Sequence, residues 1–215
     1  MNISRSQSLR MLGLLGGTFN PIHFGHLRPT LDIAEQLNLE YVHIIPAKLP
    51  PLRENPTVSA EHRLAMVKLA TQDESRFIVD TREFQRNEIS YTVDTLISLR
   101  QELGEEVSLC WIMGMDAYHH FTQWHQWQKI LQLCHLVIAH RPNYSPNENK
   151  QLNRYHTPHI CDLSHYPVGK IHFMAVTQLD ISATMLRQHR KHNRSLRYLL
   201  PDAVYHYINE NKLYL

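Results

Sequence analysis

Residues 11–26 of the chain read MLGLLGGTFNPIHFGH and join an apolar run to a glycine-rich turn. The apolar run is Met11 to Leu15, and a helical pattern starts near Gly25. Glycines at 16, 17 and 25 let the backbone approach a ligand closely, and the start of a helix offers unpaired N–H groups and the positive end of a dipole. The stretch therefore predicts a phosphate-binding loop between a strand and a helix.

Two histidines follow the turn at a spacing of three residues. If the first helical turn has begun there, His23 and His26 project on the same side and can donate hydrogen bonds to phosphate oxygens. An ordinary strand-to-helix turn with solvated histidines is the simpler alternative. Zinc ligation is a further one, although a third protein ligand is not evident nearby. The loop matches neither the Walker pattern nor GxGxxG.

Short apolar runs alternate with helical patterns along the rest of the chain, which is typical of βαβ units. We expect strands at 11–15, 41–46, 77–80, 107–113, 136–140 and 171–173, and helices at 25–37, 60–70, 92–103 and 127–133. These elements predict an α/β fold, a Rossmann-like, doubly wound parallel sheet of five to six strands with helices on both faces.

The C-terminal part, residues 182–215, predicts a helical pair. Ser182 stands at an N-cap position, and Pro201 at the first position of the second helix. The proline-containing stretch 143–170 has no clear period and predicts a long connection with room for one short helix. A length of 215 residues suits one domain covering 1–215.

Composition excludes several classes of protein. A net charge of +2 is too small for a duplex-binding surface, so we expect no nucleic-acid partner. The apolar stretch near the N-terminus is too short for a signal peptide or a membrane span, which predicts a cytoplasmic protein without membrane contact. The 16 histidines are scattered without carboxylate or thiolate partners at ligand spacing, so we expect no protein-bound metal.

Two motifs at opposite ends of the chain resemble the signatures of the nucleotidylyltransferase superfamily. Residues 16–26 resemble GGTFDPxHxGH, and residues 181–187, ISATMLR, resemble ISxTxxR. Features between them resemble the bacterial nicotinate mononucleotide adenylyltransferase branch: Pro46 with Pro50-Pro51, Ser90-Tyr91-Thr92, Gly114-x-Asp116, Trp124 and Arg141-Pro142. The resemblance spans nearly the whole chain. It implies adenylyl transfer from ATP to nicotinate mononucleotide, giving deamido-NAD and pyrophosphate in NAD biosynthesis.

The resemblance also implies roles for individual residues. It assigns catalysis to His23, His26 and Arg187. ATP phosphates would contact Gly16, Gly17, Thr18, Phe19, Gly25, Ser182 and Thr184. The mononucleotide would contact Lys48, Tyr91, Thr92, Asp116, Trp124 and Arg141, with its ring stacked on Trp124. Mg²⁺ would arrive with ATP. Taken alone, Ser182 and Thr184 also fit simple helix capping, and Trp124 also fits core packing.

Two positions depart from the family pattern. Asn20 stands where the family usually has Asp, and Leu52 stands where it usually has His, with Lys48 and Arg53 available to supply positive charge. The alternatives are nicotinamide mononucleotide or phosphopantetheine as acceptor, a non-catalytic nucleotide-binding regulatory module, and a metal-dependent hydrolase. The oligomeric state, monomer or homo-oligomer, is left open by the sequence.

Overall fold

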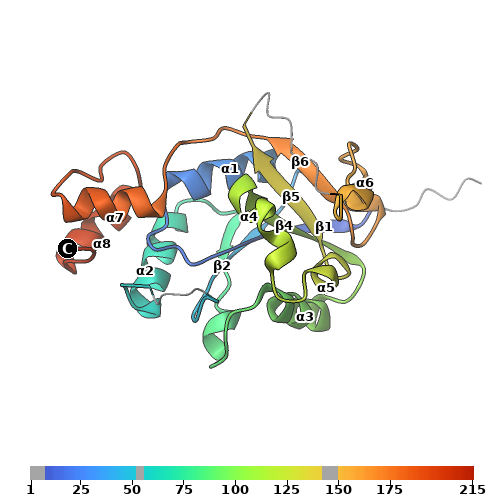
Figure 1. Ribbon diagram of the computed structural model, residues 1–215, viewed down its shortest axis with the longest axis horizontal. Coiled ribbons are helices and arrows are strands. Elements are labelled where there is room, and N and C mark those ends of the chain that lie inside the picture. The colour runs from blue at the N-terminus through green and yellow to red at the C-terminus, as the bar shows by residue number, and fades with distance from the viewer. Residues whose placement is uncertain (1–7, 52–55, 142–149) are drawn as a thin grey trace, which may run out of the picture.

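Within residues 8–51, 56–141 and 150–215, which the computed structural model describes, six parallel strands form one sheet (Figure 1). The strands are β1 (Arg10–Gly17), β2 (Val42–Pro46), β3 (Phe77–Val79), β4 (Val107–Gly114), β5 (His135–His140) and β6 (Ile171–Ala175). Their order is β3-β2-β1-β4-β5-β6. The chain therefore reverses its direction of winding between β1 and β4, the place where ligands bind in such sheets.

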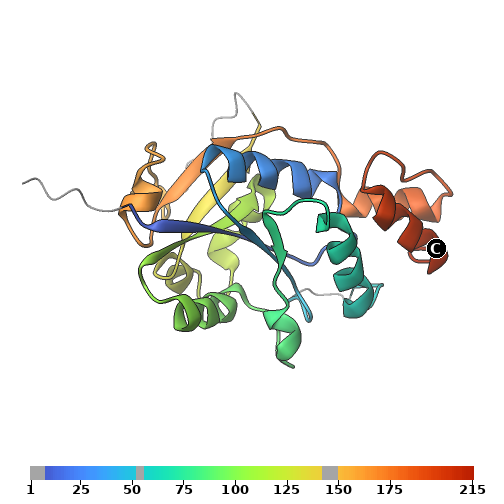
Figure 2. The same ribbon diagram turned by 180° about the vertical axis from the view of Figure 1, so that it is seen from behind.

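Helices cover both faces of the sheet, because neighbouring residues of each strand point to opposite sides. The helices α1 (Phe24–Gln36) and α2 (Ala60–Thr71) pack on one face, around Leu15 and Ile44. On the other face, α3 (Thr92–Leu103), α4 (Met115–His119) and α5 (Trp127–Leu131) surround Leu14 and Trp111. Figure 2 shows the two layers from behind. The predicted fold class is confirmed.

The predicted C-terminal pair is present as α7 (Ala183–Lys191) and α8 (Asp202–Glu210), at one end of the molecule (Figure 1). Ser182 caps α7, its Oγ accepting from the Met185 N–H at 3.1 Å. Pro201 lies one position earlier than predicted, at the N-cap of α8, because its ψ of 143° is extended. The Tyr207 hydroxyl is 2.8 Å from Nδ1 of His62, which joins α8 to α2.

Several short elements were not predicted from the sequence, because each has too few residues to show a repeating helical pattern of apolar positions. They are η1 (Arg82–Gln85), α4, η2 (Phe121–Gln123), η3 (Asn153–Tyr155) and α6 (Asp162–His165). The helix expected at 127–133 ends at Leu131, where the chain turns into β5. The connection expected at 143–170 holds η3 and α6, and residues 142–149 are outside the described part. No helix in the described ranges is long and apolar enough to span a membrane.

Candidate active site

A cavity of about 740 Å³ opens at the carboxyl ends of β1, β2 and β4. Parallel strands end at one edge of the sheet, so the loops that follow them meet there. Its volume is in the range of small-molecule sites. The lining residues that bear on function are Gly16, Gly17, Thr18, His26, Pro50, Pro51, Glu83, Ser90, Tyr91, Thr92, Trp111, Gly114, Trp124 and His125.

The glycines of the first motif make room for neighbouring groups of the protein. A Cβ on Gly16 would lie 2.4 Å from the Trp111 ring, and one on Gly17 would lie 2.9 Å from the Phe19 ring. A Cβ on Gly25 would lie 2.8 Å from the carbonyl oxygen of Ile181. From the sequence, we interpreted these glycines as allowing the close approach of a ligand. The structure adds a second reason, which is packing of rings and of the second motif.

His23 and His26 lie together at the start of α1, as their spacing predicted. Their ring centroids are 3.7 Å apart, and the His23 N–H donates to Nδ1 of His26 at 3.3 Å. Burial lowers the pKa of His26 to about 4. Burial, with the nearby His26, lowers the pKa of His23 to about 2. Both rings are therefore neutral at pH 7, and they can offer N–H groups rather than positive charge.

Only one of the two rings reaches the cavity among the described residues. His26 lines it, whereas His23 is 3% exposed and its Nδ1 has no partner in the part of the chain that the structure describes. A buried ring nitrogen without a partner reduces the stability of the fold. Because His26 lines the cavity and His23 does not, His23 lies behind His26.

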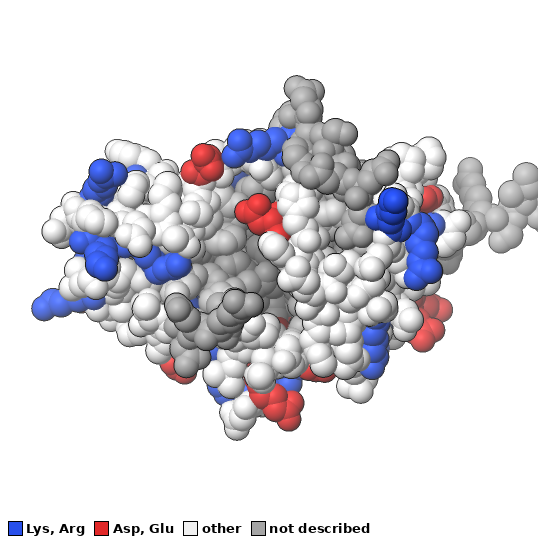
Figure 3. Space-filling model, viewed as in Figure 1, with Lys and Arg blue, Asp and Glu red and all other residues white. Residues whose placement is uncertain are grey.

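The second motif contacts the first through Arg187. Its Nη1 donates to the carbonyl oxygen of Asn20 at 2.8 Å, and its Nη2 donates to Oγ1 of Thr184 at 3.0 Å. Lys and Arg side chains gather over α7 and α8 (Figure 3). Arg187 therefore brings positive charge beside the glycine-rich loop, where a polyphosphate would be attracted.

The opposite wall of the cavity is aromatic. Tyr91 is the N-cap of α3 and Thr92 its first residue, and both line the cavity with Trp124. The Tyr91 ring is tilted by 30° against the His125 ring, with centroids 4.3 Å apart. The first N–H groups of a helix have no acceptor within it, so α3 directs donors and a positive dipole end toward this wall.

Comparisons with known proteins agree with this geometry. The cytidylyltransferase-like family model matches residues 14–189. A probable nicotinate-nucleotide adenylyltransferase of Pseudomonas putida (strain W619) is 42% identical over 99% of this chain and 98% of its own length. The chain belongs to the nicotinate-nucleotide adenylyltransferase family. A second such relative, from Halorhodospira halophila, is 44% identical over 92% of each chain.

The fold of this nucleotidyltransferase also has solved counterparts. Plasmodium falciparum nicotinic acid mononucleotide adenylyltransferase complexed with NaAD superposes with a TM-score of 0.71, covering 95% of this chain and 97% of that one. Its sequence identity is 16%, so the likeness concerns the fold. The predicted membership of the chain in this enzyme family is confirmed.

Three residues predicted to bind the mononucleotide lie outside the cavity lining of this adenylyltransferase. The Lys48 ammonium donates to the carbonyl oxygens of Phe84 and Arg86, at 3.3 and 3.0 Å, and to Oδ1 of Asn87 at 2.8 Å. Asp116 is exposed on α4. Arg141 lies 3.6 Å from the exposed Asp180. Their roles remain predictions, and Leu52 and Arg53 lie outside the described residues.

Arg63 organises the site and was missed from sequence. It is 1% exposed on α2 and donates to three carbonyl oxygens: Thr18 at 2.8 Å, Ala47 at 2.6 Å and Lys48 at 2.9 Å. It thereby fixes the loops after β1 and β2 to each other. Its signal was an arginine on the same helical stripe as Met66 and Val67, which are buried.

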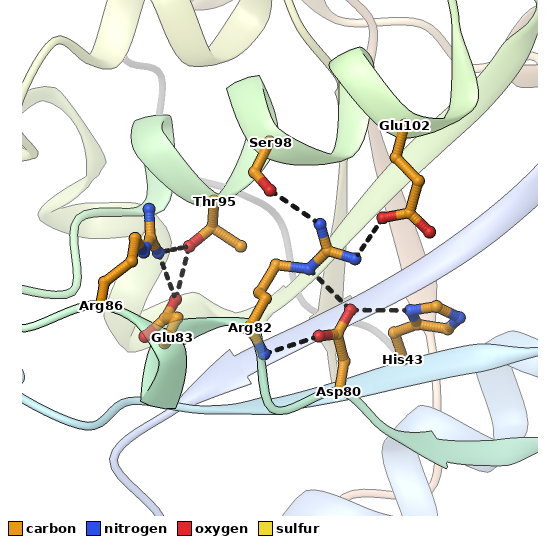
Figure 4. A network of polar contacts seen from close by, with 8 residues as sticks. All are labelled: His43, Asp80, Arg82, Glu83, Arg86, Thr95, Ser98 and Glu102. Atoms are coloured by element: carbon orange, nitrogen blue, oxygen red, sulfur yellow. Dashed lines mark hydrogen bonds and ion pairs between the residues drawn. The ribbon is translucent and has the colours of Figure 1, made fainter.

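Glu83 was missed too, because no pattern marks it. It lines the cavity at 4% exposure, and its Oε1 accepts from the Thr95 hydroxyl at 2.6 Å (Figure 4). Burial raises the pKa of this carboxyl. Next to it, Arg82 donates to Asp80 at 2.7 Å and to Glu102 at 3.0 Å (Figure 4). These contacts hold η1 against α3 and so fix the aromatic wall.

The Asp80 carboxylate is the charged centre of that network. Burial alone would raise the pKa of Asp80, but hydrogen bonds from His43 and Arg82 outweigh it and lower the pKa to about 2. Asp80 is therefore ionised at neutral pH and pairs with Arg82.

Proposed function

We propose that the protein transfers the adenylyl group of ATP to nicotinate mononucleotide, giving deamido-NAD and pyrophosphate as a step of NAD biosynthesis. The supporting observation is a single cavity with two unlike walls. The glycine-rich loop and His26 form one wall, and Tyr91, Thr92 and Trp124 form the other. A nucleoside triphosphate suits the first wall, and a flat charged heterocycle suits the second.

In the reaction, a 5′-phosphate oxygen of the mononucleotide attacks the α-phosphorus of ATP. The new P–O bond forms as the bond to the bridging oxygen of the β-phosphate breaks, and pyrophosphate leaves with that electron pair. The nucleophile is already anionic, so no general base is required. The protein contributes alignment and stabilisation of charge on the phosphoryl oxygens.

On the ATP side, His26 and Arg187 supply the donors. The neutral His26 offers an N–H group at the cavity surface, with His23 supporting it from behind. Arg187 adds a permanent cation. The backbone of Gly16, Gly17, Thr18, Phe19 and Gly25 surrounds the phosphates, and Ser182 and Thr184 start the helix that carries Arg187.

On the acceptor side, the pyridine ring stacks on Trp124. The N-terminus of α3, at Tyr91 and Thr92, offers N–H groups and a positive dipole end to the ring carboxylate, which favours the acid over the amide. Asp116 is assigned to a ribose, and Lys48 and Arg141 to the mononucleotide. These three residues lie outside the cavity lining, so binding would have to bring them closer.

We further propose that Mg²⁺ enters with ATP, bound to its phosphates. Mg²⁺ commonly binds through substrate phosphates. The enzyme would act in the cytoplasm as one domain, as a monomer or homo-oligomer, on small-molecule substrates without nucleic-acid or membrane partners.

Pyrophosphate release from ATP and Mg²⁺ tests the proposal, with nicotinate or nicotinamide mononucleotide as acceptor. We expect a strong preference for the acid, abolished by His26→Ala and by His23→Ala. A preference for the amide would change the acceptor. ATP binding without release of pyrophosphate with either acceptor would refute adenylyl transfer and favour a regulatory module.

A further inference from the structure

We propose that Tyr214, the next-to-last residue of the chain, is a positioning residue for the ATP side of the site. Its hydroxyl donates to Oδ1 of Asn20 at 2.8 Å, across 194 residues of sequence. The inference rests on the proposed function, since it assigns Tyr214 a part in that same site. Neither motif contains this residue.

The loop that Tyr214 holds is strained and depends on its neighbours. Phe19 has a φ of 46°, in the left-handed region that residues with a side chain rarely adopt. Arg63 holds the Thr18 carbonyl before it, and Arg187 holds the Asn20 carbonyl after it. Tyr214 holds the side chain of Asn20. Three donors from separate elements therefore maintain one unfavourable conformation.

Phe19 transmits the position of this loop to the cavity. Its ring meets the His26 ring edge to face, with centroids 5.3 Å apart and planes at 84°. It also fills the space that a Cβ on Gly17 would occupy. A shift of Asn20 would move Phe19 and with it His26. The aromatic wall at Trp124 belongs to the other core and lies outside this chain of contacts.

The end of the chain is fixed well enough to act as an anchor. Leu213 is 8% exposed, its N–H donates to the Ile208 carbonyl at 3.0 Å, and its own carbonyl accepts from Nε of Arg190 at 3.3 Å. Tyr214 itself is half-buried, with a φ of 62°. Burial raises the pKa of its hydroxyl, so the group keeps its proton and remains a donor at neutral pH.

The contact is compatible with the departure of Asn20 from the family pattern. The usual Asp and the Asn of this chain both present an oxygen that accepts a hydrogen bond from a hydroxyl. The substitution therefore removes charge from the loop while it retains the acceptor for Tyr214.

The experiment compares Tyr214→Phe with Tyr207→Phe in the full chain. Both variants delete one tyrosine hydroxyl from the C-terminal segment, but Tyr207 contacts His62 on α2 rather than the loop. For Tyr214→Phe we expect kcat/KM for ATP to fall about threefold to tenfold, the loss of one hydrogen bond, with the KM for nicotinate mononucleotide unchanged. Tyr207→Phe should stay within about twofold of the wild type for ATP.

A double-mutant cycle with Asn20→Ala identifies the partner. If the contact acts as proposed, the double variant Asn20→Ala with Tyr214→Phe loses no more kcat/KM for ATP than the worse single variant. Asn20→Asp should retain most of the activity. Wild-type kinetics in Tyr214→Phe, or equal losses for both substrates, would overturn the proposal.

Binding of α,β-methylene-ATP separates this inference from the proposed function, because it needs neither acceptor nor turnover. Should the wild type transfer no adenylyl group, weaker binding of this analogue by Tyr214→Phe but not by Tyr207→Phe would still support the anchor. Equal binding by all three proteins would refute it.

Discussion

Arg187 and Asn20 are joined by a hydrogen bond of 2.8 Å from the guanidinium to a backbone carbonyl, across 167 residues. The bond closes the two motif segments around one edge of the sheet. Because Arg187 also donates to Thr184, its fork is oriented from within its own helix. The same residue thus shapes the loop and adds a cation beside it.

Replacing Arg187 tests this double role. Arg187→Ala should lower kcat/KM for ATP roughly a hundredfold, as expected for loss of a donor that stabilises phosphoryl charge. Arg187→Lys should recover little, because one ammonium cannot reproduce the fork that contacts both Asn20 and Thr184. Steady-state kinetics with ATP as the varied substrate measure both.

Arg197→Ala is the matched control, since the guanidinium of this exposed C-terminal arginine lies 4.6 Å from the centroid of the Tyr205 ring on α8. An equal loss in Arg197→Ala would show that general surface charge, rather than the Arg187 fork, matters for ATP.

Gly25 permits the close approach of the two motifs, and its substitution has a sign opposite to helix propensity. Alanine within a helix normally stabilises by about 1 kcal/mol relative to glycine. At Gly25 the new Cβ would lie 2.8 Å from the Ile181 carbonyl oxygen and 2.9 Å from Nδ1 of His23. We therefore expect Gly25→Ala to reduce the free energy of unfolding by about 1–3 kcal/mol, measured by urea denaturation.

Gly114→Ala provides the comparison, because a Cβ there would meet no described atom within 4 Å. It should change the free energy of unfolding by less than about 0.5 kcal/mol. A stabilised Gly25→Ala would mean that the two motifs can separate without cost.

Some of these features could be predicted from the sequence and others could not. The strands and the loop at Gly16 were predictable, because apolar runs and glycine spacing are local properties of the chain. The contact of Tyr214 with Asn20 was not, since hydrophobic periodicity identifies a buried face without its distant partner. The role of Arg63 depends on where three loop carbonyls meet, which only the packing of α2 determines.

The two histidines of the first motif predict how stability depends on pH. Both have lowered pKa values, about 4 for His26 and about 2 for His23, against an ordinary 6.5. The unfolded chain therefore binds protons more readily than the folded protein. The contribution of the two histidines to the free energy of unfolding is fully present above pH 6.5. It is lost as the pH falls toward 4. Between pH 7.5 and 5, the free energy of unfolding in urea should fall by about 1–2 kcal/mol less for His26→Gln than for the wild type.

His206→Gln, on the exposed face of α8, is the matched substitution and should follow the wild-type curve. If His26→Gln also followed it, the His26 ring would be solvated in the folded protein, and its assignment as a neutral donor would fail.

The protonation state of His26 also predicts the pH dependence of ATP use. The profile of kcat/KM reports groups of the free enzyme. If the neutral ring binds the phosphates, kcat/KM for ATP stays flat between pH 7 and 9. If the cation is required, the value falls about tenfold for each pH unit over that range, since the pKa of the free ring is about 4.

Substitutions of Trp124 and Trp127 test substrate binding and core packing separately on the acceptor side. The rings of both residues pack against Phe121, with centroids 5.7 Å apart for Trp124 and 5.9 Å apart for Trp127, but of the two only Trp124 lines the cavity. Trp124→Ala should raise the KM for nicotinate mononucleotide about tenfold, the value of one aromatic stack, and leave the KM for ATP nearly unchanged. Trp127→Ala should instead lower the free energy of unfolding with little effect on either KM.

Trp124→Phe should restore most of the affinity, because a phenyl ring keeps the stacking face. Were Trp124→Ala to lose stability and keep its KM, Trp124 would be a core residue, and the ring would have to be bound at Tyr91 and His125.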